Sequence, residues 1–295
     1  MTGQPMRVMH APVVQVVDLT PAMRRIVFGG PNLVGYPTTG VGDEYVRILF
    51  PLAGEERPPL PDVAGDDLDY STVQGDRLRT YTIRDADPER GLVTVDFVVH
   101  DGGLAASWAK TAQVGDVIGI NTPKPLYDPP EGLQWQVLLA DNAGLPAALR
   151  LVELTPAHVR TRLVLEVAEE SHKTDLPAHP LLETTWIVGG NGHGPSCLDE
   201  AARGLQLPDG IGYVWIAGET KTLRGARKHL RRDLGLPASA YKALGYWTAD
   251  AERWRERFAA LDEATRAELD AMWDSGDDPE DIADAYEDRL DSLGL

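Results

Sequence analysis

Residues 79–84 read RTYTIR (Arg79-Thr80-Tyr81-Thr82-Ile83-Arg84) and fall on a predicted strand. Side chains alternate along a strand, so Arg79, Tyr81 and Ile83 share one face. A guanidinium can pair with a pyrophosphate through charge-assisted hydrogen bonds, and a tyrosine ring can lie against a planar ring system. Taken alone, the segment also fits an ordinary amphipathic strand with an exposed arginine. Other segments of the sequence are therefore needed to distinguish the two interpretations.

Short β-like runs surround this segment from Val8 to about Asn121, separated by turn residues. The runs are VVQVVDL, MRRIVFGG, EYVRILFP, RLRTYTIR, LVTVDFVVH and DVIGI. Their spacing predicts an antiparallel barrel or sandwich. Residues 51–78 interrupt the pattern with a stretch rich in Pro, Gly and Asp, which predicts a long loop.

The pattern changes after residues 122–134, TPKPLYDPPEGLQ, whose four prolines indicate a stiff linker. Beyond it, strand-like runs such as WQVLLA and YVWIAGE alternate with helix-like runs such as LPAALRLVELT. This alternation predicts βαβ units and a parallel sheet, with ligands at the carboxyl ends of the strands. Residues 250–295 look helical, with Ile282, Tyr286 and Leu290 on one stripe and Asp278 as a helix cap.

The expected fold class is therefore β plus α/β. We expect an N-terminal antiparallel barrel in residues 1–128, a parallel-sheet α/β domain in residues 129–248 and an acidic helical extension in residues 249–295. The formal net charge is −18, and residues 248–295 hold 16 Asp and Glu against 5 Arg. Nucleic acid is not an expected partner, because binding it needs a basic face.

The composition, with 43% hydrophobic and 25% charged residues, is typical of soluble globular proteins. Cys197 is the single cysteine, so neither a disulfide framework nor a cysteine metal cluster is expected, and no other residues show metal-ligand spacing. No run approaches the ~20 apolar residues that span a bilayer, and the first residues lack a secretory signal. We expect a cytoplasmic protein without a membrane partner.

Residues 100–110, HDGGLAASWAK, form a second segment with chemical meaning. Gly102 and Gly103 let the backbone approach a phosphate closely, and amides at the start of the following helix face an anion. Ser107 adds a hydroxyl, and Trp108 is expected to pack behind the turn. The alternative is a glycine turn that only caps a helix.

Three turns of the second half end predicted strands. They are Asp141–Ala147, Ala217-Gly218-Glu219-Thr220 and Gly245-Tyr246-Trp247. On a parallel sheet such turns face a ligand. The alternatives are a simple strand–helix turn capped by Thr220 and a buried aromatic pair at Tyr246 and Trp247.

These motifs together resemble a known family. R-x-Y-[ST] after a barrel strand is similar to the ferredoxin-reductase-like flavoproteins, and residues 79–110 resemble the siderophore-interacting proteins, over about residues 8–247 in all. The family usually reads Asp-Glu-Thr-Ala-Leu-Pro-Ala where this chain has Asp141-Asn142-Ala143-Gly144-Leu145-Pro146-Ala147. The departures at Asn142 and Ala143 remove a charge and a hydroxyl.

The resemblance implies an FAD-dependent reductase that moves electrons from NADH or NADPH through flavin to a ferric siderophore, with no catalytic side chain beyond those that bind. The cofactor-binding residues that it implies are Arg79, Thr80, Tyr81, Thr82, Val99, His100, Gly102, Gly103, Ala105, Ser107, Trp108, Asp141, Gly218, Glu219, Tyr246 and Trp247.

Several alternatives stay open. The same scaffold can serve another acceptor, and a non-catalytic siderophore-binding protein also fits. Residues 169–175, EESHKTD, are slightly acidic and favour NADH, because a 2′-phosphate needs Arg or Lys nearby. Residues 189–194, GGNGHG, fit a turn better than a phosphate site. The basic segment 221–232 is either a solvated helix or a holder of an anionic substrate. The sequence leaves the oligomeric state open.

Overall fold

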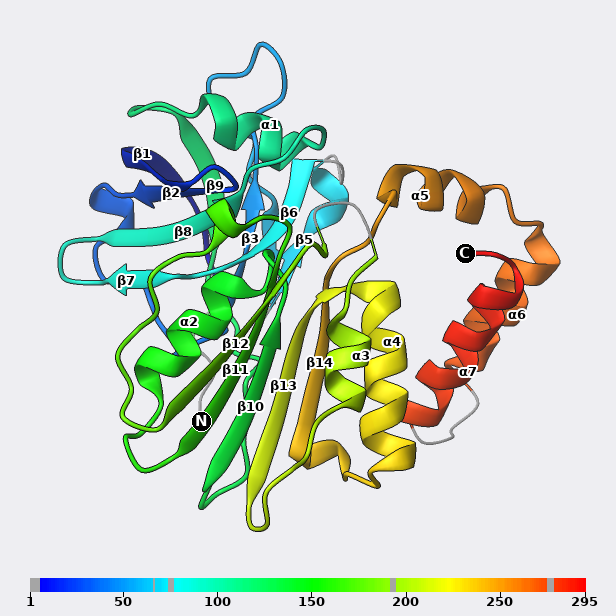
Figure 1. Cartoon of the computed structure of the whole chain (residues 1–295). Helices are drawn as coiled ribbons and strands as arrows, with labels where there is room; N and C mark the ends of the chain where they lie inside the picture. Colours follow the sequence, from blue (N-terminus) through cyan, green and yellow to red (C-terminus); the bar gives the residue numbers. More distant parts are fainter. Residues whose placement is uncertain (1–5, 66, 74–76, 192–194, 275–278) are drawn as a thin grey trace.

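The computed structural model describes residues 6–65, 67–73, 77–191, 195–274 and 279–295. A seven-stranded antiparallel sheet and a five-stranded parallel sheet dominate it, and a helical C-terminal segment lies beside the parallel sheet (Figure 1). The predicted fold class is therefore confirmed.

The antiparallel sheet has the strand order β6-β3-β9-β1-β2-β8-β7. Its strands are β1 (Val8–Thr20), β2 (Met23–Phe28), β3 (Tyr45–Leu49), β6 (Leu78–Thr82), β7 (Asp85–Asp87), β8 (Leu92–Val98) and β9 (Val117–Asn121). In β3, buried Val46 and Ile48 alternate with half-buried Tyr45 and Arg47, as expected when one face of a strand meets the core.

The sheet curls until its two ends meet. The backbone N–H of Arg84, directly after β6, donates to the carbonyl of Thr94 on β8 at 2.8 Å. The rings of Tyr81 on β6 and Phe97 on β8 lie 4.4 Å apart. Inward side chains from both ends, with Ile118 of β9, enclose one core.

Short elements fill the connections of the barrel. They are η1 (Pro31–Leu33), β4 (Asp62–Ala64), β5 (Asp67–Asp69), η2 (Tyr70–Thr72) and α1 (Leu104–Thr111). β4 and β5 pair with each other inside residues 51–78. The prediction of a plain loop is wrong there, because these short acidic strands lack the apolar alternation by which strands are identified.

The linker between the two sheets is pinned at Asp43. This fully buried carboxylate accepts from the amides of Leu126 and Tyr127 at 3.2 and 2.7 Å. It also accepts from the indole N–H of Trp215, in the parallel sheet, at 2.9 Å. One carboxylate therefore joins barrel, linker and parallel sheet, and the stiffness of the linker stays a prediction.

The parallel sheet has the order β12-β11-β10-β13-β14. Its unit contains β10 (Trp135–Ala140), α2 (Leu145–Leu154), β11 (Arg160–Val167), η4 (Glu170–His172), β12 (Leu182–Val188), α3 (Leu198–Arg203), β13 (Gly212–Glu219), α4 (Thr220–Lys228), the π-helical η5 (His229–Asp233), η6 (Ala238–Ala240) and β14 (Tyr241–Trp247). The strand order reverses at β10. Ligands bind such sheets at this switch point, here at the carboxyl ends of β10 and β13.

Helices cover both faces of the parallel sheet (Figure 1). α2 packs on one face in a cluster that also takes in Met23 from the barrel. α3 and α4 pack on the other face through residues such as Leu198, Leu223 and Leu230. The barrel therefore meets the second unit on the α2 side of the sheet.

The C-terminal extension consists of α5 (Ala251–Ala259), α6 (Glu263–Met272) and α7 (Pro279–Ser292). It has a small apolar cluster of its own around Leu269 and Leu290, to which Tyr286 belongs. The predicted cap Asp278 lies outside the described residues. Across the described residues, no helix is long and apolar enough to cross a membrane.

Candidate functional site

An aromatic cluster brings the two predicted barrel motifs together. Tyr81 of β6 contacts Phe97, with ring centroids 4.4 Å apart, and Phe50, at 6.4 Å. Trp108 of α1 contacts the same two rings, Phe50 at 5.2 Å and Phe97 at 5.9 Å. Trp108 thus packs as predicted. Burial raises the pKa of Tyr81, so its phenol stays neutral.

The glycine turn before α1 is shaped for a close approach. Gly102 and Gly103 have φ values of 85° and 77°, in the left-handed region that favours glycine. A Cβ on Gly102 would meet nothing within 4 Å. Within the described residues, no side chain caps the first turn of α1. Its amides can therefore receive an anion from the open side.

β6 lies at the edge of the seven-stranded sheet and pairs on one side with β3. On it, Arg79 is half-buried, Thr80 is exposed and Thr82 is buried. Arg79 donates from Nη1 to the carbonyl of Leu78 at 2.7 Å. An edge strand presents its outer backbone groups to a ligand, so this placement suits the expected cofactor contacts.

The other predicted residues near α1 differ in what they offer. His100 is half-buried, with Nδ1 3.0 Å from the carbonyl of Asp101. The Val99 amide donates to Ala22, at 2.8 Å, and the Ser107 side chain is exposed. Ala105 has its side chain in the barrel core, so only its backbone can touch a ligand.

Asp141 is the centre of the second half of the site. Its buried carboxylate accepts from the indole N–H of Trp247 at 2.8 Å and from the amides of Ala143 and Gly144 at 2.8 and 3.1 Å. The side-chain amide of Asn191 also donates to it. Burial raises the pKa of Asp141 to about 6, and these hydrogen bonds oppose the rise.

The two halves meet where β14 ends. Tyr246 is half-buried, and its hydroxyl lies 3.5 Å from Oγ1 of Thr82 on β6. The next residue, Trp247, reaches Asp141. The RTYTIR strand of the barrel and the switch point of the parallel sheet therefore border one region.

Glu219 serves a local purpose. Its carboxylate caps α4, accepting from the amide and hydroxyl of Thr222 at 2.7 and 3.0 Å, and it lies 3.3 Å from the amide of Ala249. Thr220, the alternative cap, instead donates its hydroxyl to the carbonyl of Trp247 at 2.8 Å. This turn is thus tied to the end of β14.

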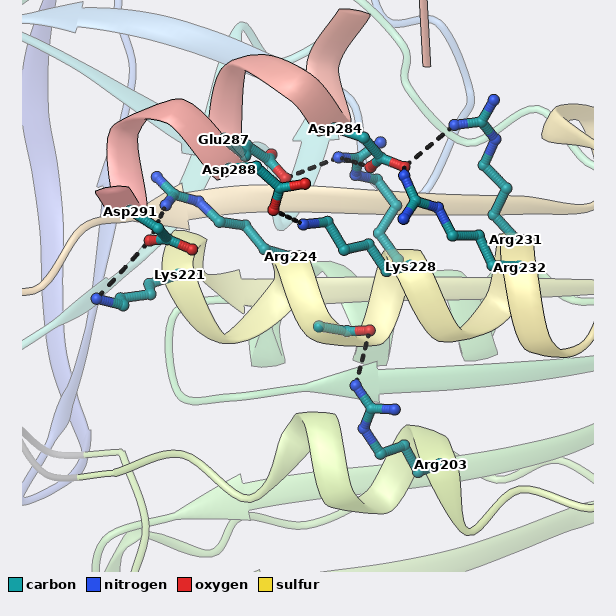
Figure 2. Close-up of polar contacts among 12 residues, drawn as sticks. Arg203, Lys221, Arg224, Lys228, Arg231, Arg232, Asp284, Glu287, Asp288 and Asp291 are labelled. Atoms are coloured by element: carbon teal, nitrogen blue, oxygen red, sulfur yellow. Dashed lines mark hydrogen bonds and ion pairs between the residues drawn. The ribbon is translucent and has the colours of Figure 1, made fainter. Parts of the chain in front are cut away.

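The basic segment faces the acidic extension. Figure 2 shows the acids of α7 pointing at cations of α4 and η5. Asp284 lies 2.6 Å from Arg227 and 2.7 Å from Arg232, and Asp291 lies 2.9 Å from Arg224. The segment is therefore no bare solvated helix, and the proposal that it holds an anionic substrate gains no support from these pairs.

The sequence interpretation missed Asn191. It follows β12, is buried and has a φ of 61°. An asparagine between glycines after a strand was the available signal, since Asn tolerates the left-handed region. Residues 192–194 of the GGNGHG segment lie outside the described residues. The part that is described, through Asn191, is held at the switch point by Asp141.

These features suit the parts of a flavin dinucleotide. The open glycine turn and the uncapped amides of α1 fit a pyrophosphate, and the half-buried Tyr81 fits a planar ring. The carboxyl ends of β10 and β13, at the switch point of the parallel sheet, suit a second nucleotide. Fold and site together define a two-domain flavoprotein.

The comparisons with known proteins name the family. The model of the siderophore-interacting FAD-binding domain matches residues 12–126, and the model of the siderophore-interacting protein matches residues 133–250. A solved siderophore utilization protein from T. fusca is 32% identical, covers 84% of this chain and 95% of its own, and has a TM-score of 0.74. The chain belongs to the siderophore-interacting protein family.

Two curated relatives carry functional names. The ferric vibriobactin reductase ViuB of Vibrio cholerae is 26% identical over 76% of this chain and 83% of its own length. The NADPH-dependent ferric-chelate reductase of Escherichia coli is 27% identical over 80% of this chain and 91% of its own length. The second name gives the expectation of NADH no support.

Proposed function

We propose that this protein is an FAD-dependent reductase that takes electrons from a nicotinamide nucleotide and delivers them to a ferric siderophore, releasing Fe(II). The observation that carries the proposal is the contact of Thr82 with Tyr246 at 3.5 Å, by which the flavin-type motif of the barrel lies beside the switch point of the parallel sheet. The names of the two reductase relatives support the choice of acceptor.

The side chains have binding and shielding roles in this proposal. The amides of Gly103 and α1, with the Arg79 guanidinium, would hold the pyrophosphate. Tyr81 would lie against the isoalloxazine, and Tyr246 and Trp247 would shield it from water. The chemistry that FAD supplies when bound is to accept a hydride and release electrons one at a time. Reduction lowers the charge of the iron and weakens its hold on hard oxygen donors.

We propose the domain division expected from the sequence: FAD in residues 1–128, the nicotinamide nucleotide in residues 129–248, and the extension in residues 249–295. The choice of nucleotide depends on the segment after β11. Lys173 pairs there with Glu170 at 2.7 Å, which offsets the positive charge that a 2′-phosphate needs. This local charge favours NADH, whereas the E. coli relative is named for NADPH.

Stopped-flow reduction of the FAD-loaded protein by NADH and by NADPH tests the donor. Fe(II) trapping with a ferrous chelator, over a panel of ferric siderophores, tests the acceptor. Flavin that is reduced but reoxidised only by quinone or free flavin would indicate another acceptor. A protein that binds ferric siderophore without binding FAD would indicate a binding protein.

Arg79→Ala is expected to weaken FAD binding, and unchanged affinity would contradict the flavin-site assignment.

A further inference from the structure

We propose that Asp141 is a positioning residue that fixes the indole of Trp247 at the flavin edge of the site, and that it does not bind a cofactor itself. The inference rests on the proposed function, because the orientation of Trp247 matters only beside a bound flavin. It changes the role that the family resemblance implies for Asp141.

The carboxylate has no acceptor position left for a ligand. Oδ1 accepts from the amides of Ala143 and Gly144 at 2.8 and 3.1 Å, and Oδ2 accepts from Nε1 of Trp247 at 2.8 Å and from the amide of Asn191. A carboxylate offers about four lone-pair positions. Asp141 is also fully buried, so a nucleotide meets its neighbours and not the carboxylate.

Gly218 makes room for this carboxylate. A Cβ at Gly218 would lie 2.6 Å from Oδ2 of Asp141 and 3.0 Å from its Cγ. Any larger residue in place of Gly218 would displace the carboxylate from Trp247. Packing against Asp141 therefore explains why position 218 is a glycine, without a contact to a cofactor.

Trp247 is held at both its side chain and its backbone. Asp141 takes the indole N–H, and the Thr220 hydroxyl donates to the Trp247 carbonyl at 2.8 Å. The β13–β14 register shifts here, with Gly218 opposite Gly245 but Glu219 opposite Trp247. Such a bulge re-aims side chains and is common beside active sites.

The bulge separates the two aromatic side chains. Tyr246, the extra residue, reaches Thr82 in the barrel, while Trp247 turns to Asp141. The last two residues of β14 therefore connect the barrel strand to the switch point. Asp141 sets the orientation of the second of them.

Only a carboxylate suits this position. Its two oxygens face N–H donors on both sides, and a carboxamide would turn its own N–H₂ against one pair of them. Asp141→Asn therefore either releases Trp247 and Asn191 or disrupts the turn at Ala143 and Gly144. Both outcomes move groups that border the flavin region.

The test compares Asp141→Asn, Trp247→Phe and the double variant, all FAD-loaded. The readouts are the visible circular dichroism of the bound flavin and the single-turnover rate of its reduction by NADH and NADPH. We expect each single variant to change the flavin dichroism in the same sense and to slow reduction about tenfold or more, since small misplacements are costly. Because Asp141 acts through Trp247, the double variant should lose no more than the worse single one.

Asp43→Asn is the matched control. Asp43 is equally buried and likewise accepts from an indole, that of Trp215 at 2.9 Å, and from two backbone amides. It should lower the Tm but change the flavin dichroism less than Asp141→Asn does, because Trp215 acts on the site through the ring of Tyr246, with centroids 6.3 Å apart. Equal spectral changes in both asparagine variants, or losses that multiply in the double variant, would overturn the proposal.

Failure of the proposed function gives a different result. If neither nucleotide reduces the wild-type flavin, the donor assignment is wrong, while the dichroism still shows whether Asp141 positions Trp247. If wild type is reduced normally and Asp141→Asn leaves dichroism and rate within about twofold of it, a change of only about 0.4 kcal/mol, the positioning role is wrong and the reductase stands.

Discussion

Arg150 on α2 and Glu44 in the barrel form a buried ion pair, with Nη2 of the guanidinium 2.7 Å from Oε1 of the carboxylate. Arg150 also donates from Nη1 to the carbonyl of Ile83 at 2.5 Å. Thr38 and Thr39 donate their hydroxyls to Glu44, each at 2.6 Å. The end of β6, the strand that carries Arg79 and Tyr81, is thereby attached to α2, which packs on the parallel sheet.

We expect Arg150→Met to lower the free energy of unfolding by about 3–5 kcal/mol, because Glu44 would be left as a buried charge without its partner. Urea unfolding followed by tryptophan fluorescence measures the loss. The control is Arg90→Met. The Arg90 side chain is 75% exposed and lies 3.9 Å from Asp87, so its loss should change the free energy of unfolding by less than about 1 kcal/mol. Similar losses in both variants would contradict a linking role for Arg150.

Gly102→Ala tests the glycine turn as a cofactor site. Gly102 has a φ of 85° and Gly54, in the loop after β3, a φ of 88°, and a Cβ at either would meet nothing within 4 Å. Alanine at either position should therefore cost about 1–2 kcal/mol of backbone strain. Only Gly102→Ala should also weaken FAD binding, by about tenfold or more, the equivalent of about 1.4 kcal/mol.

Titration of the apoprotein with FAD, followed by flavin fluorescence, measures this difference, and thermal unfolding confirms that the two variants are equally destabilised. Equal FAD affinities for Gly102→Ala and Gly54→Ala would mean that the turn only caps α1.

Strands with a strong apolar pattern could be predicted from the sequence. The run WQVLLA coincides with β10, which is buried along its whole length, so that every residue carries the signal. β7 (Asp85–Asp87) could not be predicted, because it is three residues long and acidic, and only its pairing with β8 makes it a strand. The local apolar pattern predicts a strand where burial determines the structure, as in β10. It does not predict a strand that forms only by pairing with a neighbour, as β7 does.

The candidate site was predictable motif by motif, but not in its connections. RTYTIR and HDGGLAASWAK carry local meaning, and Tyr81 and Trp108 meet through shared aromatic neighbours. The bond from Trp247 to Asp141 joins positions far apart in the chain and leaves no local trace. The pairing of α7 with α4, in contrast, does leave a pattern in the sequence. The acidic residues of α7 and the basic residues of α4 each recur at helical spacing.

The pairing of α7 with α4 leads to a prediction for Asp284. This carboxylate is 1% exposed and contacts Arg227, Arg231 and Arg232 at 2.6, 3.2 and 2.7 Å. We expect Asp284→Asn to lower the free energy of opening α7 by about 1.5–3 kcal/mol, because a buried carboxylate shared by three guanidinium groups is lost, while Arg227 keeps Glu287 and Arg231 keeps Asp281. Hydrogen exchange of the α7 amides measures the opening.

Asp281→Asn is the control on the same helix. Asp281 is 61% exposed and pairs with Arg231 at 2.6 Å, so its loss should cost less than about 1 kcal/mol. Raising the salt to 1 M, where the Debye length is about 3 Å, should lower the free energy of opening α7 in the wild-type protein. Exchange that neither substitution nor salt alters would show that ion pairs do not hold the extension in place.

The last prediction concerns pH and Asp141. Burial raises the pKa of this carboxyl from its ordinary value of 3.8 to about 6, against hydrogen bonds from Trp247, Asn191 and the turn amides. A raised pKa in the folded state means that folding favours the protonated form. The contribution of Asp141 to stability is thus fully present below about pH 4 and lost as the pH rises through about 6.

Lowering the pH should have the opposite effect on flavin reduction. Protonation turns one acceptor oxygen into a donor that faces N–H groups, so Trp247 or the turn loses a bond below about pH 6. The neighbouring Tyr246 does not titrate in this range, because burial raises its own pKa. Acidification should therefore add stability at Asp141 while it alters the flavin dichroism and slows flavin reduction.

Urea unfolding and visible dichroism of wild type and Asp141→Asn between pH 4 and 7.5 test both statements. The stability of wild type relative to the variant should fall as the pH rises from about 4 to 6, the interval between the unfolded and folded pKa values. The wild-type dichroism should change near pH 6, and that of the variant should not. Stability curves that run parallel across this interval would mean that Asp141 keeps an ordinary pKa, and its bond to Trp247 would then be independent of pH.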